Sequence, residues 1–198
     1  YRLESTQTPG RLHHHYRSKC AANFQRIIFF AGLMVCFHNK SSTNNFLLWA
    51  ALTYIITFIL EAIGVKTGMI FGRYTYGSTL GIKLFEVPLI IGFNWVFVIL
   101  GSISISRIIT TNLYLGSLIS AFIAFVFDLI LEPIAIKLDY WTWAEGIIPL
   151  QNYLAWFVIA LISAWGFGYF KIKVTSKISL HHLFVQFVFF VTLLIFYR

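Results

Sequence analysis

Charged residues are scarce in this chain: Asp, Glu, Lys and Arg make up 11% of its 198 residues, and only seven of them are acidic. Apolar residues make up 59%. A soluble domain of this size needs far more polar surface to cover itself in water. The composition therefore excludes a water-soluble globular domain and indicates an integral, multi-pass membrane protein with the lipid bilayer as its solvent.

Cysteine and catalytic signatures are also lacking. Cys20 and Cys36 form neither a disulfide framework nor a metal-ligand spacing. The sequence has no nucleotide-binding loop, no histidine cluster of the desaturase and hydroxylase type, and no nucleophile elbow. Oxidative and hydrolytic chemistry lack their usual residues, so we expect no metal and no cofactor.

The net charge of +8 does not indicate nucleic-acid binding, because the basic residues are scattered through connections and the first 26 residues. With six spans, one side of the membrane holds Arg2, Arg11, Arg17, Lys19, Arg26, Lys66, Arg73, Lys83, Lys137 and Arg198, and the other holds Lys40, Arg107, Lys171, Lys173 and Lys177. Basic loops favour the cytoplasm. We therefore predict a cytoplasmic N-terminus in the cell (inner) membrane, although the cluster at 171–177 argues the other way.

Apolar runs predict the spans, since a helix needs roughly 20 residues to cross a bilayer. The runs are Phe46–Ile63, Val87–Ile105, Leu113–Leu131, Tyr153–Phe170 and Leu183–Tyr197, with the shorter Ile27–Phe37 as a sixth candidate. The predicted fold class is all-α: a polytopic transmembrane helical bundle of five to six spans. It forms a single domain over residues 24–198, after a polar basic N-terminal arm over residues 1–23.

Two long central connections, 64–86 and 132–152, fall on the same side of this bundle and predict a functional mouth there. Gly64, Gly68 and Gly72 recur every four residues in the first of them. Lys66 interrupts any continuous span through these glycines, so we predict a backbone turn or re-entrant segment.

Acidic residues are concentrated in the same region. Apart from Glu4 they are Glu61, Glu86, Asp128, Glu132, Asp139 and Glu145. An ionised carboxylate near the end of a span costs several kcal/mol unless it is paired or hydrated, which makes Glu61 and Asp128 functional candidates. Asp128 and Glu132 are four residues apart and project from one helix face. Pro133 disfavours helical geometry at Glu132 and predicts a helix end or kink there.

Like charges held close together, and partial burial, both favour a protonated acid. We therefore predict Asp128, Glu132 and Glu61 as catalytic residues. The alternative is that these carboxylates form ion pairs that only join the helix ends. The candidate basic partners are Lys66, Arg73, Lys83 and Lys137.

Aromatic and amide side chains accompany the acids. The predicted substrate-binding residues are Tyr74, Tyr76, Asn94, Trp95, Trp141, Trp143, Asn152 and Trp156. Aromatic faces stabilise a cation by about 0.5 to 2 kcal/mol each, and they line a slot for a conjugated polyene. For any single Trp or Tyr the alternative is a membrane-interface belt. Asn94 and Asn152 either hydrogen-bond water or the carboxylates, or cross-link helices.

Two segments are specific enough to compare with a known family. They are EAIGVKTGMIFGRYTYGSTLGIKLFEVPLIIGFNW at 61–95 and DLILEPIAIKLDYWTWAEGIIPLQNYLAWF at 128–157. Together they resemble the carotenoid biosynthesis protein family, which includes the membrane γ-carotene and bisanhydrobacterioruberin hydratases. The resemblance implies addition of water across the terminal double bond of an acyclic carotenoid end group, without a redox cofactor.

The residues suit that implied reaction. Asp128 or Glu132 is the expected proton donor, Trp141 and Trp143 shelter the tertiary cation, and Glu61 orients the water. The expected partner is a carotenoid or other polyprenyl lipid, with other enzymes of the pathway as candidate partners. The alternatives are another cation-based polyprenyl enzyme, such as a cyclase or isomerase, and a non-enzymatic carotenoid or lipid carrier.

Overall fold

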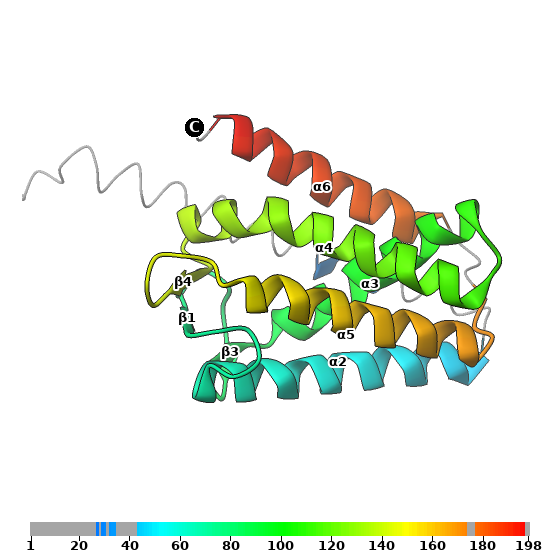
Figure 1. Cartoon of the computed structure of the whole chain (residues 1–198), viewed down its shortest axis with the longest axis horizontal. Helices are drawn as coiled ribbons and strands as arrows, with labels where there is room; N and C mark the ends of the chain where they lie inside the picture. Colours follow the sequence, from blue (N-terminus) through cyan, green and yellow to red (C-terminus); the bar gives the residue numbers. More distant parts are fainter. Residues whose placement is uncertain (1–26, 28, 31, 35–42, 174–176, 197–198) are drawn as a thin grey trace, which may run out of the picture.

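The described part of the chain is built mainly from long helices that lie side by side (Figure 1). The computed structural model describes residues 27, 29–30, 32–34, 43–173 and 177–196. The helices are α2 (Thr43–Thr67), α3 (Ile90–Ile109), α4 (Leu113–Lys137), α5 (Leu150–Tyr169) and α6 (Ile178–Phe196). All five are long and apolar enough to cross a membrane. The predicted helical membrane bundle is therefore confirmed.

Each predicted run from Phe46 onward corresponds to one of these helices, with shifted ends. The largest change is in α4, which continues to Lys137 rather than ending near Leu131. Val87 and Pro88 form a short strand instead of beginning α3. The described residues between 27 and 34 are helical, whereas the arm at 1–23 lies outside the described residues.

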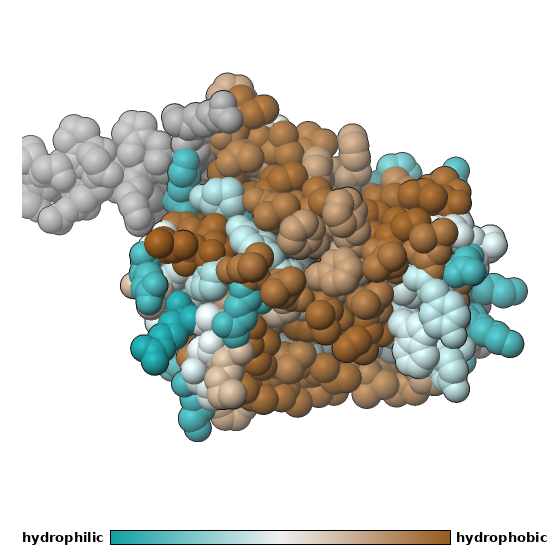
Figure 2. Space-filling model, in the orientation of Figure 1, coloured by the Kyte–Doolittle hydropathy of each residue, from teal (hydrophilic) through white to brown (hydrophobic). Residues whose placement is uncertain are grey.

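Helix α3 is the centre of the bundle. Within its apolar span 72% of the residues are buried, compared with 28–50% in the other four helices. Those four helices therefore turn much of their apolar surface outward. Figure 2 shows the result on one face: hydrophobic side chains form a band across the middle, and hydrophilic side chains gather at the two ends. This arrangement is expected of a protein whose sides contact lipid.

The two central connections meet at one end of the bundle, as predicted. Strand β1 (Tyr74–Tyr76) comes from the first connection and pairs antiparallel with β4 (Trp141–Trp143) from the second. A second small sheet joins β2 (Lys83–Leu84) to β3 (Val87–Pro88). The glycine spacing predicts a turn or re-entrant segment here, and these strands were not predicted.

A glycine ends α2 and begins the first connection. Gly68 has φ +69° and donates its backbone N–H to the carbonyl of Gly64 at 2.7 Å. This left-handed conformation after a helix end favours glycine. The predicted turn is thus present from Gly68 onward, whereas Gly64 still lies inside α2.

Charge in residues 43–173 and 177–196 does not decide the orientation. Lys66, Arg73, Lys83 and Lys137 lie toward the end with the sheets, and Arg107, Lys171, Lys173 and Lys177 lie toward the other end. The cytoplasmic placement of the N-terminus depends on basic residues of the arm and stays a prediction.

Candidate functional site

The β1–β4 sheet turns four aromatic side chains toward the bundle. Its strands read Tyr-Thr-Tyr and Trp-Thr-Trp, and in each the outer two residues are buried while the central threonine is exposed. Side chains alternate between the two faces of a strand, so both tyrosines and both tryptophans share one face. The register places Tyr74 opposite Trp143 and Tyr76 opposite Trp141.

Both tyrosines donate hydrogen bonds to Glu61, which α2 brings to this end of the bundle. The phenol of Tyr76 lies 2.8 Å from Glu61 Oε2, and the phenol of Tyr74 bonds to the same oxygen. The indole N–H of Trp95, from α3, donates to Glu61 Oε1 at 2.8 Å. Glu61 is only 5% exposed, and its two oxygens accept all three of these bonds.

The tyrosines keep their protons in this setting. Burial, followed by the negative charge of Glu61, raises the pKa of the Tyr74 phenol above its ordinary value. Burial and the charge of Glu61 likewise raise the pKa of the Tyr76 phenol well above its ordinary value. Both side chains therefore remain hydrogen-bond donors to the carboxyl group.

Both tryptophans of β4 donate instead to Glu132 of α4. Trp141 Nε1 and Trp143 Nε1 each lie 2.9 Å from Glu132 Oε2. The other oxygen, Oε1, accepts from Asn152 Nδ2 at 2.9 Å. On the buried face of the sheet, strand β1 therefore binds Glu61 and strand β4 binds Glu132.

Asn152, in the first turn of α5, links the two carboxyl groups of α4. Its Nδ2 donates to Asp128 Oδ2 at 2.8 Å as well as to Glu132. Asp128 is completely buried, and its second oxygen, Oδ1, has no hydrogen-bond partner among the described residues. A buried polar atom without a partner costs roughly 1–3 kcal/mol. Among the described residues of the site, Asp128 Oδ1 is therefore the buried polar atom that lacks a hydrogen-bond partner.

Of the helix end or kink predicted at Glu132, the helix end is wrong, and the kink stays a prediction. Helix α4 continues through Pro133 to Lys137, and Leu138 N still bonds to the Ile134 carbonyl. Proline removes one backbone N–H from the helix ladder, but membrane helices tolerate it where neighbouring groups compensate. The unbroken helix keeps Asp128 and Glu132 on one face, as their spacing predicted.

The donors that hold the three carboxyl groups are neutral phenol, indole and amide groups. The proposed basic partners do not supply these bonds; Lys83, for example, donates to the backbone carbonyl of Tyr76 at 2.6 Å. Two of the other acids, Glu86 and Glu145, are exposed and do not belong to the cluster. Neutral donors stabilise a carboxylate without neutralising its charge. The site thus retains the capacity to carry negative charge.

A small cavity of about 20 Å³ lies between these groups. It is lined by Glu61, Phe71, Tyr74, Tyr76, Ile91, Asn94, Trp95, Glu132, Trp141, Trp143, Asn152 and Trp156. A single water needs roughly 10–15 Å³ by this kind of measure, so the cavity has room for one water. All eight predicted substrate-binding residues lie on its wall, and Asp128 joins them through Asn152.

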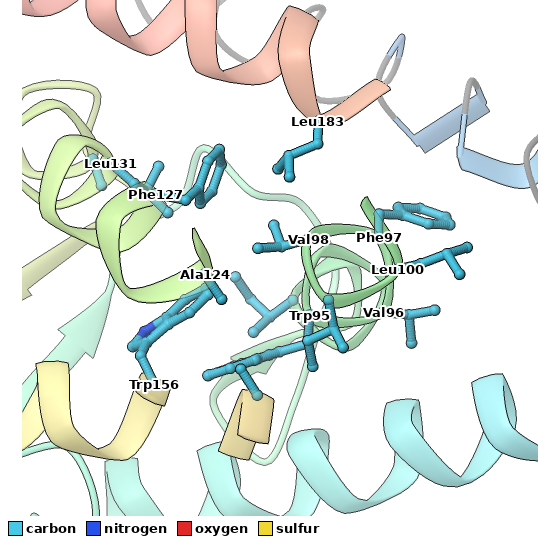
Figure 3. Close-up of a cluster of buried hydrophobic side chains, with 14 of the residues drawn as sticks. Trp95, Val96, Phe97, Val98, Leu100, Ala124, Phe127, Leu131, Trp156 and Leu183 are labelled. Carbon is cyan, nitrogen blue, oxygen red and sulfur yellow. The ribbon is translucent and has the colours of Figure 1, made fainter. Parts of the chain in front are cut away.

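Two tryptophans close the cavity on the side of the bundle core. The rings of Trp95 and Trp156 are stacked with their centroids 3.8 Å apart. Figure 3 shows both among the buried side chains, with Trp156 reaching from α5 toward Ala124 of α4. The aromatic residues therefore have two functions in the fold: their N–H and O–H groups bind the acids, and their rings line the space beside them.

Two parts of this arrangement were not predicted. Ile91 lines the cavity beside Phe71, and it has no polar side-chain atom to mark it in the sequence. Gln151, next to Asn152, donates to the Met69 carbonyl rather than to the carboxyl groups. Across the described residues, His, Cys, Asp and Glu side chains form no group suited to hold a metal ion.

Comparisons with known proteins agree with the resemblance found in the sequence. The bisanhydrobacterioruberin hydratase of Haloarcula japonica (strain ATCC 49778) is 28% identical over 124 residues. That alignment covers 56% of this chain and 40% of the hydratase, so less than half of the relative is represented. No solved structure matches the chain. The profile of the family described as carotenoid biosynthesis protein matches residues 23–198, nearly the whole chain, and the protein belongs to that family.

Proposed function

We propose that the protein is a cofactor-independent carotenoid hydratase that adds water to the terminal double bond of an acyclic carotenoid end group. The observation that carries the proposal is the buried cluster of Glu61, Asp128 and Glu132 beside a cavity with room for one water. Acid-catalysed hydration needs a proton donor, a bound water and a proton acceptor in a shielded place. The cluster supplies groups for each of these tasks.

Asp128 is the proton donor in this proposal. Hydrogen bonds to a carboxylate favour its ionised form. Glu61 and Glu132 each accept three such bonds, whereas Asp128 shares one amide and leaves Oδ1 unbonded. A proton on Oδ1 removes the cost of a buried, unbonded, charged oxygen. Asp128 is therefore the carboxyl group best suited to enter the reaction as an acid.

The reaction then balances without any other reagent. The π bond of the alkene takes the proton of Asp128, forming a C–H bond at the less substituted carbon and a tertiary cation at the other. Water forms the C–O bond to that cation and loses a proton to Glu61 or Glu132. Because the net reaction consumes only water, this proton returns to Asp128 before the next cycle.

The aromatic wall stabilises the intermediate. The rings of Tyr74, Trp143, Trp95 and Trp156 lie on the cavity wall, and each aromatic face contributes about 0.5 to 2 kcal/mol toward a nearby cation. Glu61 and Glu132 add negative charge close by. The room for a water beside the acids favours hydration over cyclisation, because a cyclase has to keep water away from its cation.

Mass spectrometry of carotenoids tests the proposal. Cells that make an acyclic or monocyclic carotenoid would express the chain, the Asp128→Asn variant, or the Glu145→Gln variant as a control with an exposed acid. We expect a pigment heavier by one water with the wild type and Glu145→Gln, and its loss with Asp128→Asn. A product of unchanged mass but different retention would indicate a cyclase or isomerase. An unaltered pigment profile with the protein in the membrane would support a carrier.

A further inference from the structure

The carboxyl cavity is far too small for a carotenoid. Its volume of about 20 Å³ has room for one water, and the β1–β4 sheet covers it on the side of the connections. The hydrocarbon body of a long substrate therefore needs another place, in contact with lipid and continuous with the cluster. Two apolar grooves on the sides of the bundle are candidates.

The first groove lies between α2 and α5, which run side by side along the face seen in Figure 1. Its volume is about 180 Å³, and its lining is Trp49, Leu52, Thr53, Ile56, Leu60, Ile159, Ile162, Ser163 and Gly166. These are the two helices that carry Glu61 and Asn152. Leu60 directly precedes Glu61, and Ile159 is one turn after Trp156 of the cavity wall. The groove thus approaches the cluster from the lipid side.

Trp49 and Gly166 lie at the end of this groove that is farther from the cluster. Trp49 Nε1 donates to the Ser163 carbonyl at 2.9 Å, so the indole has its polar atom satisfied by protein. The Trp49 ring also packs edge-on against Phe167, with centroids 4.8 Å apart. From Trp156 to Gly166 the helix rises about 15 Å, at roughly 1.5 Å per residue. A linear hydrocarbon chain fits such an elongated, apolar space.

The second groove is larger but lies on the wrong side of α4. It has a volume of about 420 Å³ between α4 and α6, and its lining includes Val126 and Phe127. Phe127 packs against Phe190 of α6, and Figure 3 shows it on the side of α4 that faces Leu183. Asp128, in contrast, bonds to Asn152 of α5. Helix α4 therefore separates the second groove from the acids.

We propose that the α2–α5 groove holds the polyene body of the substrate while its end group reaches the carboxyl cluster. This inference rests on the proposed function for the identity of the occupant. The α4–α6 groove takes ordinary lipid chains and serves as the internal control.

Gly166 offers a direct way to fill the groove. Apart from Gly166, its two chain neighbours and the backbone of its own helix, no heavy atom lies within 4 Å of the position that a Cβ would occupy there. A larger side chain therefore enters the groove without displacing the core. Gly166→Leu and Gly166→Phe form a graded series, and Ile162→Trp fills the same groove from an exposed position. Val126→Phe is the matched control, since it adds an aromatic ring to the other groove.

Two substrates separate the groove from the chemistry: a long carotenoid, and a short isoprenoid alkene with the same end group. For the long substrate we expect the KM of Gly166→Phe to rise about tenfold or more, the effect of losing roughly one buried apolar side chain of contact. Gly166→Leu should show a smaller rise, and Ile162→Trp a rise in the same direction. The short substrate should be turned over at the wild-type rate by every variant, and Val126→Phe should match the wild type with both.

Binding of the long polyene to the full-length purified protein, measured by its absorbance, separates this inference from the proposed function. If the wild type binds polyene without hydrating it, the function fails, and weaker binding by Gly166→Phe and Ile162→Trp still supports the groove. The groove assignment is overturned if the correctly folded Gly166 and Ile162 variants bind polyene as the wild type does, if Val126→Phe alone weakens binding, or if the wild type binds none.

Discussion

Tyr74 and Trp143 lie directly opposite each other across the β1–β4 sheet, and each donates a hydrogen bond to a different glutamate. Their ring centroids are 5.1 Å apart. One cross-strand pair therefore connects Glu61 of α2 with Glu132 of α4. Because both donors are neutral, the sheet fixes the positions of two carboxyl groups without cancelling their charge.

Removing one of these donors should lower the stability of the fold. Trp143→Phe keeps most of the ring but deletes an N–H bond to Glu132, so we expect the free energy of unfolding to fall by about 1–3 kcal/mol. Thr142→Val is the control, because Thr142 lies on the exposed face of the same strand and should change stability by no more than about 0.5 kcal/mol. Denaturation in detergent micelles measures the free energy of unfolding of both variants. Equal stability of the two variants would mean that the bond to Glu132 contributes nothing.

The sequence predicted the spans and the chemistry-bearing side chains because both have strong local signals. Runs of apolar residues mark helices that face lipid, and carboxyl groups near the ends of such runs are costly enough to stand out. Asp128 and Glu132 needed only helical spacing to be placed on one face. Their convergence with Glu61 was expected because the two central connections, which follow Glu61 and Asp128, fall on the same side of the bundle.

Two features were not predictable in the same way: the β1–β4 sheet, and the fact that its tyrosines donate to Glu61 while its tryptophans donate to Glu132. Three-residue strands such as Tyr74–Tyr76 give too short an alternating pattern, and their pairing joins positions far apart in the chain. The continuation of α4 through Pro133 depends on tertiary contacts that override a local preference. The roles of Asn152 and of the unbonded Asp128 Oδ1 emerge only when the partners of each atom are known.

The two tyrosines of β1 should resist ionisation at alkaline pH. Because burial and the charge of Glu61 raise their pKa values above the ordinary value of about 10, the folded protein holds these protons more tightly than the unfolded chain does. The contribution of these two phenols to the free energy of unfolding is thus fully present below pH about 10 and declines as the pH rises further. Ultraviolet difference spectra against a Tyr74→Phe, Tyr76→Phe double variant should show no phenolate signal near pH 10. Ordinary titration there would contradict the buried donor assignment.

Gly77 should be required where β1 meets the residues before β4. Its N–H bonds to the Tyr140 carbonyl at 2.9 Å, and a Cβ at Gly77 would collide with the Asp139 backbone and lie 2.7 Å from its carboxyl carbon. We expect Gly77→Ala to separate the strands, lowering thermal stability and turnover together. Gly146→Ala is a useful comparison, since it has a positive φ but open space around it. Circular dichroism melts and turnover assays on both variants distinguish collision from backbone strain.

Asn152→Ala tests two roles for this residue. It either positions the carboxyl groups or, as predicted from the sequence, contacts the substrate. Its amide is the one donor to Asp128 and one of three to Glu132 among the described residues. If it positions the acids, kcat should fall about 10- to 100-fold with KM nearly unchanged, the effect of losing one hydrogen bond to the charged Glu132 and one to Asp128. Gln151→Ala is the neighbouring control, because its exposed amide bonds to the Met69 carbonyl. A raised KM with unchanged kcat would instead place Asn152 against the substrate, and Asp128 would then need another group to hold its position.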